Sequence, residues 1–430
     1  MKRWLAVWFY LVAVGVWLAA CQTISPRIQP SATAVSPTAT ITLPTATPAA
    51  QTPVGFEQFL AGAQAQQLSQ RPATVNGYMA QVEQAPLIGP ETAVILYRGP
   101  GQRVQLLGDM NNWNPETAAD LTRLEGTDLW YLVASFEPAA RLDYLFLIDG
   151  SERRLDPLNP QLGPNPTGPR SVLVMPAYDD PLPVVGAPPR GVVSSHTLDS
   201  AALNETRTFF VYEPPGQVIG QPLPVLIMNN GSNFLTLLEM PRYLDALIAE
   251  RILPPLLVVF VPPIDAAIEY ALNDNYAVFL ADELVPYLQG NFNVSGQAAE
   301  TGIAGADLGA LAAVQAAIRR PDVFGLLVGL SGPYAFGDGR LLDEIGDSAA
   351  RLGLQKDAAS EQRVFLAVGS YETGQTSQDR GPLDLVQAAE SLETALIEGG
   401  RQIRLEQRPA GHSWGYWRDA LIRGLIFLYG

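Results

Sequence analysis

Cysteine, histidine and positive charge are all scarce in this chain of 430 residues. The only cysteine is Cys21, so no disulfide can form within the chain. Two histidines, His196 and His412, leave few candidates for an imidazole base. Lysine and arginine number 27 against 43 aspartates and glutamates, a formal net charge of −16. Nucleic acids attract positive charge, so this composition argues against a nucleic-acid partner. We also expect no metal and no cofactor.

The first 21 residues have the pattern of an export signal. Two basic residues precede an apolar run over 4–20, which ends in Leu18-Ala19-Ala20-Cys21. This ending resembles the bacterial lipobox, whose cysteine is lipidated and becomes the mature N-terminus. It predicts an extracytoplasmic protein, anchored to a membrane through a lipid on Cys21. An ordinary signal peptide and a transmembrane anchor are the alternatives, although the run is short for a membrane span.

Two further segments precede the folded modules. Residues 22–53 are rich in Thr, Pro, Ala and Ser and contain no acidic residue, which predicts a disordered tether. Residues 54–85 carry spaced apolar side chains, which indicate one or two short amphipathic helices.

Residues 86–176 change to short alternating strands separated by turn residues, a pattern typical of a small β-sandwich. The strands are predicted at 92–97, 103–108, 129–136 and 143–149.

The segment GDMNNWNP at 108–115 and the strands after it resemble glycogen-binding and isoamylase N-terminal modules. The resemblance implies an Ig-like, early-set sandwich and a sugar-stacking role for Trp113. Leu145 and Glu152 stand where that family has a lysine and a second tryptophan. One aromatic platform binds sugar weakly, so we expect little carbohydrate binding. The alternative is a packing domain that shapes the neighbouring site.

Residues 177–430 alternate strands with helices, which predicts a mostly parallel doubly wound sheet. Within this part, residues 301–320 indicate a buried strand, a tight turn framed by Gly305 and Gly309, and an Ala-rich helix. This is the pattern of the nucleophile elbow G-x-S-x-G of α/β hydrolases. The residue at the centre of the turn is Asp307 instead of serine.

The order of the motifs resembles the enterochelin-esterase-like branch of the α/β hydrolases. The matching segments include VYEPP, LPVLIMNNGSNF, LVVFVPP, GIAGADLGALAAVQAAIRRPDVFG, VGSYET and PAGHSWGYW. The resemblance implies an α/β-hydrolase fold with His412 as the base and Glu372 as its carboxylate partner. It also implies oxyanion donors at the backbone N–H of Leu308 and of a residue near Gly231 or Ser232.

Two serines are set aside as nucleophiles. Ser413 lies in Gly411-His412-Ser413-Trp414-Gly415, which matches G-x-S-x-G as a string. The base of a hydrolase triad follows the nucleophile in the chain, and no histidine follows Ser413. Ser331 ends a strand and is interpreted as a wall residue. His196 precedes the first predicted core strand and is interpreted as a surface or junction residue.

Three hypotheses remain for Asp307. The first is a degenerate esterase in which Asp307 pairs with protonated His412, backed by Glu372, and the pocket binds a cationic or hydroxylated ligand. The second is an active hydrolase of an ester, epoxide or halide with Asp307 as nucleophile. The third is a scaffold protein whose site is vestigial.

Overall fold

The computed structural model describes residues 55–430 except 182–187, 217–219, 338, 352–360 and 378–380. The predicted signal, with Cys21, and the predicted tether lie outside the described residues. None of the helices in the described ranges combines the length and the apolar composition needed to cross a bilayer. The predicted helical segment contains α1 (Phe56–Gln64) and α2 (Arg71–Met79), joined by stacking of Phe59 on Tyr78.

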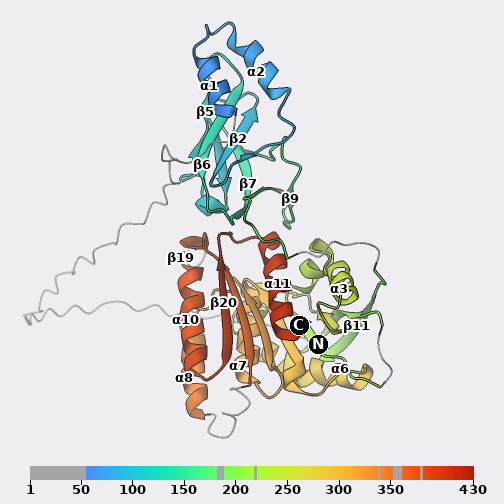
Figure 1. Ribbon diagram of the computed structural model, residues 1–430. Helices are drawn as coiled ribbons and strands as arrows, with labels where there is room; N and C mark the ends of the chain where they lie inside the picture. Colours follow the sequence, from blue (N-terminus) through green and yellow to red (C-terminus); the bar gives the residue numbers. More distant parts are fainter. Residues whose placement is uncertain (1–54, 182–187, 217–219, 338, 352–360, 378–380) are drawn as a thin grey trace, which may run out of the picture. The chain divides into compact units, whose positions relative to one another are not determined.

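The β module consists of two antiparallel sheets around a shared core (Figure 1). The four predicted strands are present, and their register fixes which side chains meet in the core. The Ig-like class of the module stays a prediction. One sheet has the order β1 (Leu87–Ile88), β2 (Thr92–Arg98), β6 (Leu129–Ser135), β5 (Thr122–Arg123). The other has the order β4 (Ala119–Asp120), β3 (Val104–Gly108), β7 (Arg141–Ile148), β10 (Arg170–Val174), β9 (Leu162–Gly163), with β8 (Glu152–Arg154) on β7 and the short helix η1 (Asp109–Asn111) after β3.

The second module is built on an eight-stranded sheet that is parallel from its third strand onward, as the sequence predicts. Its first strand pairs antiparallel at the edge and was not expected from the sequence. An edge strand pairs with one neighbour only. In this strand, exposed residues alternate with partly buried ones, so it lacks the apolar run that marks a covered strand. The order is β11 (Val192–Ser200), β12 (Glu205–Glu213), β14 (Leu257–Phe260), β13 (Val225–Met228), β15 (Thr301–Ala306), β16 (Leu326–Leu330), β17 (Arg363–Gly369), β20 (Gln402–Arg408).

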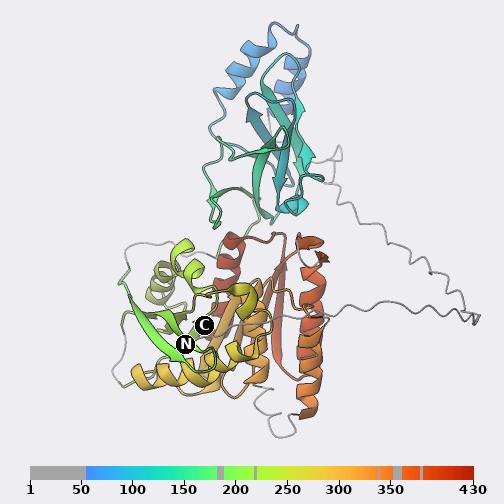
Figure 2. The ribbon, with the colours of Figure 1, turned by 180° about the vertical axis from the view of Figure 1, so that it is seen from behind.

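Helices cover both faces of this sheet, as Figures 1 and 2 show from opposite sides. Successive side chains of a strand point to opposite faces, so Ile227 joins one core and Leu226 the other. This explains why the central strands are continuous apolar runs. One face carries α4 (Ala266–Glu269), α5 (Asp274–Val278), η3 (Phe279–Leu284), α6 (Val285–Asn291), α7 (Leu308–Arg319), α8 (Arg340–Arg351) and α10 (Leu385–Glu398). The other carries α3 (Met240–Ala249) and α11 (Trp414–Tyr429), with η2 (Asn233–Leu237) before α3.

The helical segment over 274–291 consists of α5, η3 and α6 in succession, with a widened π turn in the middle. Pro286 follows this turn and has no N–H to donate, which disfavours the regular α-helical ladder there. Short additional elements are η4 (Ala298–Glu300) and the pair β18 (Gln375–Ser377) and β19 (Gly381–Leu383).

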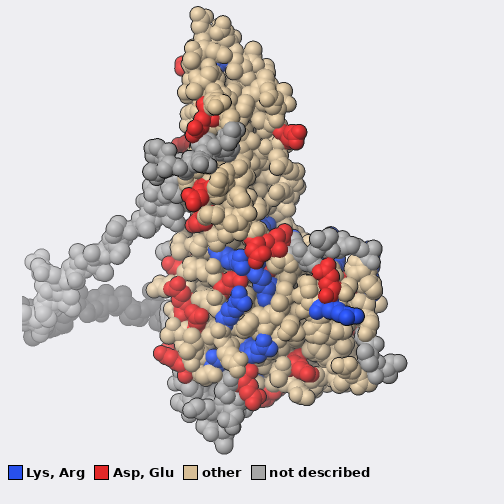
Figure 3. Space-filling model, viewed as in Figure 1, with Lys and Arg blue, Asp and Glu red and all other residues tan. Residues whose placement is uncertain are grey.

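Charged side chains of both signs are interspersed on the face seen in Figure 3, where arginines gather over the region of β20 and α11. Glu406 of β20 lies among three of them and pairs with Arg404, Arg408 and Arg423. This face therefore presents no uniformly basic area of the kind that a polyanion would need.

Candidate functional site

The predicted elbow is present, with Asp307 between β15 and α7. Its backbone lies at φ 50° and ψ −128°, a region that residues with side chains rarely adopt. A Cβ on Gly305 would lie 2.1 Å from the Gly309 carbonyl oxygen, and one on Gly309 would lie 1.9 Å from Asn230 Oδ1. Only glycine therefore fits on either side of the turn. The strain places the Asp307 carboxylate at the carboxyl edge of the sheet, where its side chain is 48% exposed.

His412 lies between β20 and α11 and meets both predicted partners. Its Nδ1 is 2.7 Å from Oε2 of Glu372, and its Nε2 is 3.9 Å from Oδ1 of Asp307. The ring also packs edge-on to Trp417, with the ring centres 4.6 Å apart. The structure thus brings together the three residues that the sequence analysis singled out, in the order carboxylate, imidazole, elbow residue.

Glu372 follows β17 and is completely buried. Its Oε1 accepts the N–H of Gly369 and the hydroxyl of Ser331, each at 2.7 Å. Ser331 in turn accepts the indole N–H of Trp417 at 2.9 Å. Ser331 therefore orients the carboxylate of Glu372, a more specific role than the wall residue expected from the sequence. Its positive φ of 49° places it there, which no sequence pattern signalled.

The imidazole of His412 favours its protonated form. Burial lowers the pKa of His412, but the hydrogen bond and the charge of Glu372, followed by the charges of Asp307 and Asp109, raise it to about 9. Near neutral pH the site therefore contains an imidazolium between two carboxylates. Because the folded-state pKa lies above the ordinary 6.5, protonation stabilises the fold below about pH 6.5, and this contribution is lost as the pH rises through 9.

We expect the ring signals of His412 to titrate near pH 9 in an NMR experiment, because Glu372 stabilises the imidazolium. With two histidines in the chain, His196 serves as an internal reference. Glu372→Gln should lower the apparent pKa of His412. Unchanged titration of His412 in a folded Glu372→Gln protein would contradict the assigned hydrogen bond.

The predicted oxyanion donors are the amide of Leu308 and that of a residue near Gly231 or Ser232. The amide of Gly231 donates to the carbonyl of Val261 at 3.0 Å and is therefore already engaged in the structure. A Cβ on Gly231 would lie 2.3 Å from the Val261 nitrogen. The lack of a side chain at Gly231 therefore allows its backbone to lie close to that of Val261. The remaining candidates are the amide of Leu308, at the first position of α7, and that of Ser232, just before η2.

Two asparagines directly after β13, to which the sequence analysis assigned no role, form hydrogen bonds to the backbone of the elbow. Asn230 Oδ1 accepts the amide of Ala306 at 3.2 Å, and Asn229 Nδ2 donates to the carbonyl of Gly309 at 2.9 Å. The hydroxyl of Tyr276 donates to Asn229 Oδ1 at 2.9 Å. In the sequence, only the position of these asparagines directly after an apolar strand run could have indicated this role.

Ser413 and His196 lie apart from this chemistry. Ser413 is buried at the start of α11, and its Oγ accepts the amide of Tyr416 at 3.4 Å, as a helix-capping serine does. His196 lies on the edge strand β11, where its Nε2 is 2.8 Å from the hydroxyl of Ser194. Its ring stacks on Phe209. Neither residue approaches Asp307 through a described contact.

Trp113 is engaged within the β module. Its indole N–H donates to Asp109 at 2.9 Å, and the guanidinium of Arg170 lies over its ring, 5.1 Å from the centre. The ring also packs on the cluster Leu107, Ala118 and Leu147. These contacts leave little of the ring for a sugar to stack on.

We therefore expect no retardation of the protein in affinity electrophoresis through glycogen, since the aromatic platform is already covered. Trp113→Ala should migrate as the wild type does in gels with and without glycogen. Strong retardation of the wild type that disappears in Trp113→Ala would reverse this expectation.

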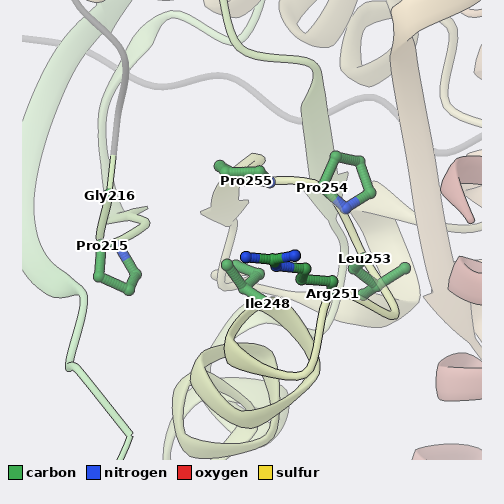
Figure 4. Close-up of a pocket in the computed structure, with 7 residues that line it drawn as sticks. All are labelled: Pro215, Gly216, Ile248, Arg251, Leu253, Pro254 and Pro255. Atoms are coloured by element: carbon green, nitrogen blue, oxygen red, sulfur yellow. The ribbon is translucent and has the colours of Figure 1, made fainter.

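A cavity of about 630 Å³ lies elsewhere in the second module (Figure 4). It is lined by Pro215, Gly216, Ile248, Arg251, Leu253, Pro254 and Pro255. These residues adjoin the end of the antiparallel strand β12 and the start of β14. They therefore lie at the amino end of the parallel strands, whereas the elbow lies at the carboxyl end. Sites in such sheets form at the carboxyl ends of the strands, so this cavity is not the candidate site. Across the described ranges, no cluster of His, Cys, Asp or Glu has the arrangement of a metal site.

Comparison with known proteins agrees with this geometry. The family described as "Putative esterase" matches residues 200–428. The iron(III) enterobactin esterase of Escherichia coli O6:H1 is 25% identical over 366 residues, covering 76% of this chain and 86% of that protein. The uncharacterized protein YjcH of Bacillus subtilis is 24% identical over 246 residues, covering 56% of this chain and 98% of that protein.

Among solved structures, the enterobactin esterase of Shigella flexneri superposes with a TM-score of 0.65 at 22% identity, covering 78% of this chain and 92% of that chain. At this identity the likeness establishes a shared fold. Since the family model spans more than half of the chain, the protein belongs to the Putative esterase family, an enterochelin-esterase-like group with the α/β-hydrolase fold.

Proposed function

We propose that this protein is a degenerate member of the esterase family that binds a ligand at the elbow without hydrolysing esters. The observation that carries the proposal is the carboxylate of Asp307 at the elbow, 3.9 Å from Nε2 of His412. The lipobox-like segment supports the further proposal that the protein is held outside the cytoplasm by a lipid on Cys21.

The chemistry of acyl transfer explains why a carboxylate is unsuited to this position. A serine attacks after the histidine removes its proton, and the oxyanion that forms is stabilised by backbone N–H groups. Asp307 has no proton to give, its attack on an ester would produce an anhydride, and its charge would repel the oxyanion. Its stable partner is protonated His412, which then cannot act as a base.

The ligand that suits this pair carries hydroxyl groups or a positive charge. The half-exposed carboxylate of Asp307 accepts hydrogen bonds, and the imidazolium of His412, a quarter exposed, donates one. A dihydroxybenzoyl-serine is a suitable first probe, since an enterobactin esterase of the same fold has been crystallised in the presence of 2,3-dihydroxy-N-benzoyl-serine.

A second function is favoured by the intact surroundings of Asp307. The strained elbow and the hydrogen bond between His412 and the buried Glu372 are retained, although strain and the burial of a carboxylate both cost stability. In this alternative the Asp307 carboxylate attacks an sp³ carbon. A halide leaves as the halide ion, whereas the oxygen of an opened epoxide stays on the neighbouring carbon and takes a proton from the imidazolium of His412. Water then attacks the carbonyl carbon of the aspartyl ester, which breaks the bond to the alcohol oxygen and regenerates the carboxylate. One proton of the water goes to the departing alcohol and the other to neutral His412 or to solvent.

One experiment separates the two functions. The soluble part (residues 54–430) is incubated with short aryl esters, or with halide and epoxide substrates, in water enriched in ¹⁸O. If the protein is a degenerate esterase, we expect no turnover, no labelling by a fluorophosphonate and no ¹⁸O in the peptide that contains Asp307. Incorporation of ¹⁸O at Asp307 with turnover would establish the aspartate nucleophile and overturn the first proposal.

A further inference from the structure

The loops that carry His412 and Glu372 are both held by the β module. The described residues from 55 to 430 form a single compact unit. The amide of Arg141, at the start of β7, donates to the carbonyl of Pro409 at 3.0 Å, and Arg141 bridges Ala410 as a parallel strand would. The side-chain amide of Asn112 donates to the carbonyl of Thr373 at 2.6 Å. The backbone of each of these two loops therefore accepts a hydrogen bond from the β module.

Asp109, in η1, lies directly against the backbone next to His412. A Cβ on Gly411 would lie 2.3 Å from both Cβ and Cγ of Asp109, so no side chain fits between them. Oδ2 of Asp109 accepts the amide of Asp143 at 2.7 Å, and Oδ1 accepts the indole N–H of Trp113. The carboxylate is thus buried, oriented by two donors, and close enough that its charge favours the imidazolium of His412.

Arg141 lies on the other side of the same loop. Its buried guanidinium is 3.0 Å from Oδ1 of Asp143 and 3.6 Å from Oδ2 of Asp419, in α11. It also donates to Ser413 Oγ at 3.4 Å. A Cβ on Gly415 would lie 2.0 Å from its Nη2, so the guanidinium packs on the first turn of α11. Both chain neighbours of His412 therefore contact the β module.

We propose that Asp109 and Arg141 of the β module are positioning residues for His412, and that the Gly108–Trp113 segment forms a wall of the esterase-fold site instead of a sugar-binding surface. If Asp109 and Arg141 served only to pack the β module against the loop of His412, apolar side chains would do so at a lower desolvation cost. Here a buried carboxylate and a buried guanidinium instead face the residues before and after the histidine. The meaning of this arrangement for ligand binding rests on the function proposed above for the Asp307–His412 pair.

The first test follows the titration of His412 by NMR in Asp109→Asn. The charges that face the ring are those of Glu372, Asp307 and Asp109, so removing one should shift its midpoint downward. Burial and the charge of Asp143 raise the pKa of Asp109 to about 7, so Asp109 is ionised where His412 titrates. The matched control is Asp120→Asn, an exposed carboxylate of the same module paired with Arg103, which should leave the midpoint in place.

The second test is a double-mutant cycle on thermal unfolding with Gly411→Ala and Asp109→Gly. The new methyl group collides with Asp109, so Gly411→Ala should lower Tm, and adding Asp109→Gly should restore part of the loss. An unshifted His412 titration in folded Asp109→Asn, or strictly additive Tm changes, would overturn the proposal. Neither readout requires catalysis, so ester turnover by the wild type would refute the proposed function and leave this inference standing.

Discussion

Asp307→Ser should give the protein aryl-esterase activity that the wild type lacks. The substitution removes a carboxylate that repels the oxyanion and supplies a hydroxyl whose proton His412 can accept. His412 remains hydrogen-bonded to Glu372, and the strained elbow already has the geometry that a serine nucleophile needs. Loss of one triad member typically costs several orders of magnitude in rate, so we expect a gain of roughly 10³-fold over the wild type.

The pH profile of Asp307→Ser should reflect the titration of His412. The charge of Asp307 is one of the causes that raise the pKa of His412. Its removal should therefore lower that pKa and increase the fraction of neutral His412 near pH 8. Esterase activity should therefore rise with pH as His412 loses its proton. The measurement is hydrolysis of a short-chain p-nitrophenyl ester across pH 6–9.

Two controls define the result. Asp307→Asn matches the aspartate in size and removes its charge, but it supplies no hydroxyl and should stay inactive. Asp307→Ser/His412→Ala should lose the gained activity, because the hydroxyl then has no base. A folded Asp307→Ser protein that hydrolyses no short ester would show that the site has changed beyond the elbow, and the scaffold hypothesis would replace the ligand-binding one.

Arg207→Met should destabilise the second module by about 3–5 kcal/mol, since it leaves a buried carboxylate without its partner. Arg207 lies on β12 with a side chain only 1% exposed. Its Nη1 and Nη2 each lie 2.9 Å from an oxygen of Glu269, whose side chain is 8% exposed, and Nη2 also donates to the carbonyl of Pro262 at 2.8 Å. Glu269 in turn accepts the amides of Ile264 and Asp265, so the pair fixes the segment after β14.

The matched control removes the other partner of the same guanidinium. Glu205 also pairs with Arg207 at 2.8 Å, but its side chain is 36% exposed. Glu205→Gln should cost less than about 1 kcal/mol, because water replaces an exposed partner. Urea unfolding followed by tryptophan fluorescence measures both variants. Equal small losses would mean that Glu269 is solvated in solution, contrary to its burial in the structure.

The Arg207–Glu269 pair also explains the role of the short segment Ile268-Glu269-Tyr270. Glu269 and Tyr270 form the E-Y of IEY, after which the chain turns into α5. Glu269 binds Arg207, and the hydroxyl of Tyr270 accepts the amide of Asn230 beside the elbow. The motif is therefore a structural link between the segment after β14 and the strand end that supports Asp307.

The sequence alone determined the elements that depend on local chain chemistry. Continuous apolar runs identified the central strands, because both faces of a covered parallel sheet are buried. Gly305 and Gly309 identified the elbow, because the turn excludes a Cβ at both positions. The chain order of Asp307, Glu372 and His412 was sufficient to nominate them as one site, since their segments matched those of a known fold.

Tertiary structure decided everything that depends on contacts between distant segments. Gly231 is next to the elbow, yet its amide is taken by Val261 of the neighbouring strand segment, which no local pattern reveals. Ser331 reaches Glu372 only because its strained backbone turns it toward β17. Asp109 and Arg141 are about 270–300 residues from His412 in the chain, and only folding brings their charges to its loop. Apolar periodicity records which side of an element is buried, but it holds no information about which other element covers that side.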